Sequence, residues 1–114
     1  MTITRYEPDG RKCQAVVHGD TIYLAGQIGE GDGIAEQTRN ALAEVERLLA
    51  LTGGTKSDIL SVTVWLADMD DFDGMNAVYD AWVDPNNQPT RACGESRLGA
   101  PEFLVEFMVI AAKR

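Results

Sequence analysis

Arg91 and Glu106 are the two charged residues whose positions in largely apolar runs suggest chemistry. Arg91 lies near the start of a strand-like run, residues 90–96, and its planar guanidinium can bind a small carboxylate, such as a 2-keto or 2-imino acid, through two hydrogen bonds. Glu106 is the only ionisable side chain on one apolar face of residues 103–112. A buried carboxylate there is costly unless it is paired, hydrogen-bonded or protonated, so either such a partner or a functional role is expected. The structural alternatives are a salt bridge from Arg91 to one of the 18 acidic residues, and a Glu106 that reaches water at the rim of an interface.

Cys93 shares a strand face with Arg91, because side chains alternate along a strand. It could be a nucleophile, but a small buried side chain is the favoured interpretation, and Cys13 and Cys93 are expected to be free thiols. His18 is the only histidine, so neither a Ser-His-Asp triad nor a multi-histidine metal site is expected. The glycines at 26, 29, 31 and 33 do not form a dinucleotide-binding motif. We therefore expect no metal and no organic cofactor.

The elements that must position these residues follow from periodicity and turn signals. A helix is predicted to begin after Asp32 or Gly33 and to end at Gly53-Gly54, and a second helix is predicted from Asp70 or Asp71 to about Val83. The expected strands cover residues 12–18, 22–28, 59–67, 90–96 and 103–112. The predicted order is β-β-α-β-α-β-β in a single α+β domain, residues 1–114.

Two helices can cover only one face of such a sheet. In residues 59–67 we expect Leu60 on the same apolar face as Val62, Val64 and Leu66. Residues 103–112 are apolar on both faces, so something must cover the second one. Since no further segment of the chain remains to do so, a closed homo-oligomer is predicted.

Composition excludes several classes of function. The net charge of −8, without a cluster of basic residues, disfavours binding to nucleic acid. No segment has the run of about 18 apolar residues that spans a membrane, and residues 1–5 do not resemble a secretory signal. A cytoplasmic protein without membrane contact is therefore the expectation.

Four segments together resemble a known family. They are Tyr23–Ile28, Val64–Asp68 with the following Phe72, Met75, Asn76 and Tyr79, then Pro89–Cys93, and finally Val105–Phe107. This pattern is similar to that of the Rid family, the YjgF-type reactive intermediate deaminases, over nearly the whole chain. The resemblance implies a chorismate-mutase-like α+β fold with two helices on one face of one sheet. It also implies a homotrimer whose sheets form a central barrel, with sites in the clefts between subunits.

The resemblance further implies hydrolysis of reactive enamines and imines, such as 2-aminoacrylate and its imine tautomer 2-iminopropionate, to 2-keto acids and ammonia. Arg91 would bind the substrate carboxylate, and Glu106, expected on a neighbouring strand, would hold or activate water. The Cys93 backbone would contact the imine nitrogen, and Gly26 and Asn76 would shape the cleft.

Two positions depart from better-known members of the family. Ala25 stands where they carry a serine, and Lys12 or a neighbour stands where they carry a tyrosine. One alternative is a non-catalytic trimer that binds small carboxylates through Arg91, because a fold does not determine function. A ribonuclease role is disfavoured by the sequence pI near 4.4.

Overall fold

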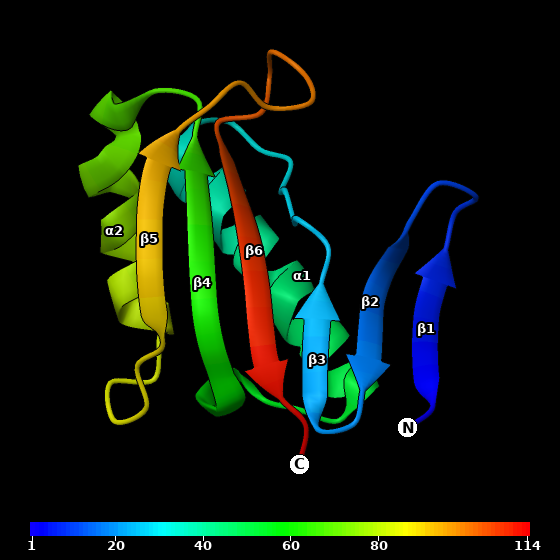
Figure 1. Ribbon diagram of the computed structural model, residues 1–114. Coiled ribbons are helices and arrows are strands. Elements are labelled where there is room, and N and C mark those ends of the chain that lie inside the picture. Colours follow the sequence, from blue (N-terminus) through cyan, green and yellow to red (C-terminus); the bar gives the residue numbers. More distant parts are fainter.

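Six strands form one mixed sheet, and two helices pack on one of its faces (Figure 1). The computed structural model describes all residues from Met1 to Arg114. The strands and helices are β1 (Ile3–Pro8), β2 (Cys13–His18), β3 (Thr21–Leu24), α1 (Ile34–Thr52), β4 (Ile59–Leu66), α2 (Phe72–Trp82), β5 (Thr90–Glu95) and β6 (Val105–Ala112). Their order across the sheet is β1-β2-β3-β6-β4-β5. All neighbouring pairs are antiparallel except β4 and β5, so the β4–α2–β5 crossover leaves β5 at an edge of the sheet.

The predicted order β-β-α-β-α-β-β lacked the first strand. β1 pairs antiparallel with β2 at the other edge of the sheet, and most of its residues are exposed. Its register is held by main-chain pairing, and Glu7 additionally forms an ion pair with Arg47 of α1. A strand that buries little apolar surface has no hydrophobic periodicity, so the pattern could not predict it.

The two helices agree with the pattern that predicted them. α1 begins after Gly33 and ends at Gly53, whose φ of 96° is the left-handed conformation that terminates many helices. Its apolar stripe packs with one face of the sheet to form the core. In Figure 1, α2 runs alongside and partly behind the edge strand β5, and its polar residue Asn76 contacts Arg91 of that strand.

One extra residue within β4, and another just after β3, change which side chains share a face. In β4 the register against β6 shifts between Ile59 and Ser61, so Leu60 is extruded and 52% exposed. The prediction that Leu60 joins the apolar face was therefore wrong. Between β3 and the isolated bridge of Gln27 to Phe107, the chain also gains one residue against β6, at Ala25–Gly26. This second irregularity moves the backbone of Gly26 toward Glu106.

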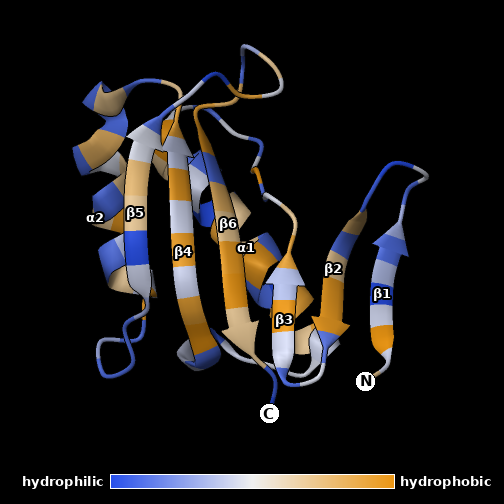
Figure 2. Cartoon of the chain, in the orientation of Figure 1, coloured by the Kyte–Doolittle hydropathy of each residue, from blue (hydrophilic) through white to orange (hydrophobic).

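The second face of the sheet is uncovered, as the apolar pattern of the last strand predicted. Tyr23 of β3 is 47% exposed, and Met108 and Ile110 of β6 are 43% and 37% exposed. Figure 2 shows polar and apolar residues alternating along β4, whereas β6 is apolar along most of its length. We call this surface, which also carries Trp65 and Glu106, the open face. Neither helix has the length and apolarity needed to cross a bilayer.

Candidate functional site

Arg91 lies on the helix-covered side of edge strand β5 and is held by α2. Its Nη1 donates a hydrogen bond of 2.7 Å to Oδ1 of Asn76. The guanidinium carbon lies 4.8 Å from the centroid of the Tyr79 ring and 5.9 Å from that of Phe72. Aromatic faces stabilise a cation in this position without using its N–H donors. The guanidinium is therefore oriented while most of its donors stay free.

No carboxylate neutralises Arg91. The ion pairs of the chain are formed by Arg47 and Arg114, so the salt-bridge alternative for Arg91 is not realised within one subunit. Arg91 instead lines a small cavity of about 160 Å³ together with Tyr79, Gln88 and Pro89. Asp80 also borders this cavity. An arginine without an acidic partner, in a chain with 18 acidic residues, is a suitable receptor for an external carboxylate.

Cys93 lies two residues further along β5 and packs against the core as a free thiol. Burial raises the pKa of this thiol, and the positive charge of Arg91 opposes the shift only in part. Burial likewise raises the pKa of the Tyr79 hydroxyl, against the charge of Arg91. Both groups are therefore neutral near pH 7, and neither is activated as a nucleophile.

Glu106 and Gly26 form a second group of residues on the open face. A Cβ built on Gly26 would lie 1.8 Å from Oε2 of Glu106, so the carboxylate rests directly against the glycine backbone. Glu106 makes no ion pair within the chain. It lines a cavity of about 310 Å³ with Lys12, Gln14 and Gly26, and Gln27, Ile28, Gly99 and Phe103 complete the wall.

The structure brings Arg91, Asn76 and Cys93 together, and separately Gly26 and Glu106, but it does not join the two groups in one chain. Arg91 is paired with Val62 of β4, which faces the core, whereas Glu106 is paired with Trp65 of the same strand. Successive residues of a strand point to opposite faces, so the two charged side chains leave opposite faces of the sheet. The expectation that their strands are neighbours was also wrong, because β4 lies between β5 and β6.

Lys12, Gln14 and Gln27 line the cavity beside Glu106 although no sequence motif pointed to them as site residues. The side-chain amide of Gln27 donates a hydrogen bond of 2.8 Å to Oε1 of Gln14, which fixes one wall of the Glu106 cavity. Alternation along β2 could have indicated that residues 12, 14 and 16 share the open face. The backbone irregularity at Ala25–Gly26 brings Gly26 to Glu106. No local sequence pattern like the alternation along β2 could have indicated it.

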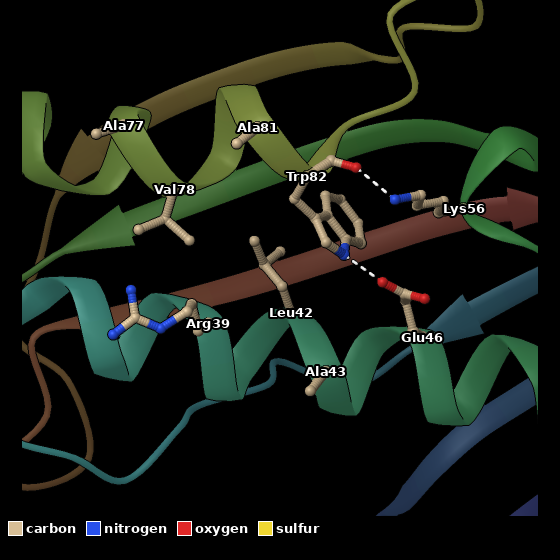
Figure 3. A pocket seen from close by; sticks show the side chains of 9 residues that line it. All are labelled: Arg39, Leu42, Ala43, Glu46, Lys56, Ala77, Val78, Ala81 and Trp82. Atoms are coloured by element: carbon tan, nitrogen blue, oxygen red, sulfur yellow. Dashed lines mark hydrogen bonds between the residues drawn. The ribbon is translucent and has the colours of Figure 1, made fainter.

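The largest cavity lies elsewhere, between α1 and α2 (Figure 3). Its volume is about 550 Å³, and its apolar walls include Leu42, Val78 and Trp82. Trp82 donates its indole N–H to Glu46, and Lys56 donates a hydrogen bond of 2.7 Å to the Trp82 carbonyl (Figure 3). None of the predicted site residues lines this cavity.

Comparison with known proteins identifies the class to which this fold and site belong. A family model described as endoribonuclease L-PSP matches residues 2–113. A RutC family protein of Haemophilus influenzae is 39% identical over 97% of this chain and 98% of its own length. The RutC family protein YoaB of Escherichia coli is also 39% identical, over 98% of this chain and 99% of its own length.

Solved structures agree with this classification. The crystal structure of NMB1025 from Neisseria meningitidis, a member of the YjgF protein family, has a TM-score of 0.99 and 40% identity, covering all of this chain and 97% of the other. Rv2704 of Mycobacterium tuberculosis has a TM-score of 0.90 and 29% identity, over 97% of this chain and 99% of the other. The chain belongs to the YjgF/RidA/RutC family, which confirms the membership that its motifs predicted.

Proposed function

We propose that this protein hydrolyses small reactive 2-imino acids and their enamine tautomers to 2-keto acids and ammonia, without a metal or organic cofactor. The observation that carries the proposal is the guanidinium of Arg91, which is held by Asn76 and Tyr79 and has no acidic partner. It is a preformed receptor for the carboxylate of such a substrate.

The sites of the proposed enzyme lie between subunits of a homotrimer. The open face exposes Tyr23, Met108 and Ile110, and apolar surface of this kind favours association with another copy. β5 is an edge strand, so part of its main chain has no partner within the subunit. When the β5 edge of one subunit meets the open face of the next, Arg91 of the first approaches Glu106 of the second across the cleft.

Glu106 supplies the acid–base chemistry of the proposed reaction. Its carboxylate accepts a proton from water as the water oxygen bonds to the imine carbon and passes this proton to the nitrogen, which gives a neutral carbinolamine. The same carboxylate then carries the hydroxyl proton to the nitrogen as the C=O bond forms and the C–N bond breaks, so that ammonia and the 2-keto acid leave and Glu106 is again ionised. Since imines already react readily with water, fixing the substrate carboxylate and one water molecule provides most of the required rate increase.

The experiment is a hydrolysis assay with imines generated in place by an amino-acid oxidase. We expect the wild type to accelerate conversion of 2-iminopropionate and 2-iminobutyrate to keto acids. Because hydrogen bonds to charged groups contribute about 1.5–3 kcal/mol, Arg91→Ala is expected to lower kcat/KM about 10- to 150-fold. Glu106→Gln is expected to lower kcat with less effect on KM, because it removes the proton acceptor and keeps the shape of the side chain.

Two outcomes would contradict the proposal. Full activity of Arg91→Ala would remove Arg91 from the site. No imine hydrolysis by the wild type, together with keto-acid binding that is lost in Arg91→Ala, would favour the non-catalytic carboxylate-binding trimer. The net charge of −8 disfavours the ribonuclease activity that the description of the family model names.

A further inference from the structure

The cavity beside Glu106 is also lined by a basic residue, the exposed Lys12. Lys12 immediately precedes β2, and its backbone is held on both sides by Asp9. The Lys12 N–H donates a hydrogen bond of 2.9 Å to Oδ1 of Asp9, and the Lys12 carbonyl accepts one of 2.9 Å from the Asp9 N–H. The backbone of Lys12 is therefore fixed at the cavity that Glu106 and Gln14 also line.

Lys12 forms no ion pair within the chain, although the Asp9 carboxylate, which accepts hydrogen bonds from the backbone N–H groups of Lys12 and Arg11, lies near enough for these bonds and the charge of Lys12 to lower the pKa of Asp9. It lines the same cavity as Glu106 without forming an ion pair with it. The amides of Gln14 and Gln27, on the same wall, are bonded to each other. Lys12 is thus the one basic residue among those that line this cavity.

Closing the cleft with a second subunit removes water from Lys12, and an ammonium that loses water without gaining an anion is destabilised. With a substrate that has one carboxylate, Arg91 of one subunit binds that carboxylate, and the anion left for Lys12 of the other subunit is Glu106, whose basicity an ion pair would reduce. With a substrate that has a second carboxylate, Lys12 binds that group, and Glu106 stays free to accept a proton from water.

We infer that the preferred substrates are 2-imino acids with a second, side-chain carboxylate, and that Lys12 binds this second carboxylate. The inference rests on the proposed function, because it places the imino acid between Arg91 of one subunit and Glu106 of the next. It assigns Lys12 as a specificity-determining residue. The cavity of about 310 Å³ lies at the lower end of the range of about 300–1,000 Å³ typical of small-molecule sites, which suits a compact dicarboxylic acid.

The test compares two imines of equal carbon-chain length, each generated in place by an oxidase that accepts the parent amino acid. One is 2-iminoglutarate, and the other is 2-iminopentanoate, which lacks the second carboxylate. We expect the wild type to have the higher kcat/KM on 2-iminoglutarate. In Lys12→Met we expect the ratio of the two kcat/KM values to fall about 10- to 150-fold, the range for loss of a charged hydrogen bond.

Arg11→Met is the matched control, because it removes one positive charge from an exposed neighbour that lines none of the cavities. The ratio is expected to stay at its wild-type value in this variant. An equal fall in both variants would indicate an effect of net charge and overturn the inference. An equal loss on both imines in Lys12→Met would show that Lys12 acts only through Glu106, and would overturn it as well.

A binding measurement separates failure of the inference from failure of the proposed function. Calorimetry with 2-oxoglutarate and 2-oxopentanoate requires no turnover. If no imine is hydrolysed, the proposed function fails, whereas a selective loss of 2-oxoglutarate affinity in Lys12→Met still supports Lys12 as the receptor of the second carboxylate. If 2-iminopentanoate is hydrolysed and Lys12→Met leaves the ratio unchanged, the proposed function stands and the inference is wrong.

Discussion

Arg91 and Glu106 leave the sheet from opposite faces, with β4 between their strands. Adjacent strands are about 4.8 Å apart, so two strand spacings and the thickness of the sheet separate the side chains within one chain. One subunit therefore cannot present both groups to a small ligand. The same arrangement suits a site between two subunits, in which an edge strand of one copy meets the open face of another.

Asn76 is expected to hold the Arg91 guanidinium in the orientation that binds the substrate carboxylate. Its Oδ1 accepts the 2.7 Å hydrogen bond from Arg91, and Asn76→Ala removes this orienting bond but keeps the guanidinium charge, so the KM for 2-iminobutyrate should rise only about 2- to 10-fold. Asn76→Asp keeps the shape but places a carboxylate on the guanidinium. This internal acid competes with the substrate, so we expect a larger rise in KM than in the alanine variant. An Asn76→Asp enzyme with wild-type KM would show that Arg91 does not bind the substrate.

Gly26 and Gly29 provide a matched pair of substitutions. In Gly26→Ala the new Cβ meets only the flexible end of Glu106, so the carboxylate must move, and we expect loss of hydrolysis with little change in Tm. In Gly29→Ala the Cβ would lie 2.4 Å from the backbone nitrogen of Ala41, so overpacking should cost about 1–3 kcal/mol of stability. Thermal unfolding and imine hydrolysis separate the two effects. A fully active Gly26→Ala enzyme would contradict the placement of Glu106 at the reacting atoms.

Cys93 is expected to be slow to alkylate. Since burial raises the pKa of its thiol, the reactive thiolate should form at higher pH in the folded protein than in the unfolded chain. In a Cys13→Ser background, alkylation by iodoacetamide at pH 8 should be slower for folded protein than for protein in urea. The pH–rate curve of the folded protein should lie at higher pH. A curve displaced to lower pH would indicate an activated cysteine and would favour the nucleophile alternative.

Asp84 is expected to make the loop between α2 and β5 sensitive to acid. Hydrogen bonds from Ser57, from the Asn86 N–H and from the Asn87 amide lower the pKa of Asp84 from 3.8 to about 2. A lowered carboxyl pKa contributes stability above the unfolded value, and this contribution is lost as pH falls from about 4 to about 2. Asp84→Asn should therefore have a lower Tm than wild type at pH 6, and the difference should shrink toward pH 2. A Tm difference that is constant over this range would contradict this role.

The helices and most strand faces could be predicted because their signals are local. The apolar spacing of α1 and the left-handed position of Gly53 specify that element within a short window of sequence. β1 could not be predicted, because it buries little apolar surface and depends on main-chain pairing with β2. Leu60 was assigned to the wrong face because a single extra residue in β4 reverses the alternation.

For the candidate site, the sequence indicated residue types but not their arrangement in space. Insertion of β4 between β5 and β6 depends on long-range pairing, so the spacing of Arg91 and Glu106 in the sequence could not show that they face opposite sides. The contact of Arg91 with Asn76 joins a strand to the helix that precedes it, and it follows from the β4–α2–β5 crossover. The proximity of Lys12 to Glu106 required the fold, because two strands and a backbone irregularity bring them to one cavity.

The central claim, that one site uses Arg91 and Glu106 from different subunits, is tested most directly by complementation. Arg91→Ala and Glu106→Gln chains carrying different tags are co-expressed, and the trimers that contain both are isolated by successive affinity steps. A trimer has three interfaces and one site at each. In a trimer that contains both variants, only one of the three sites combines a native Arg91 with a native Glu106, so we predict about one third of wild-type imine hydrolysis. Each parent variant, carrying both tags in the same way, should show only the low residual activity expected for its substitution. Mixed trimers that are no more active than their parents, or a protein that forms no doubly tagged complex, would contradict the account.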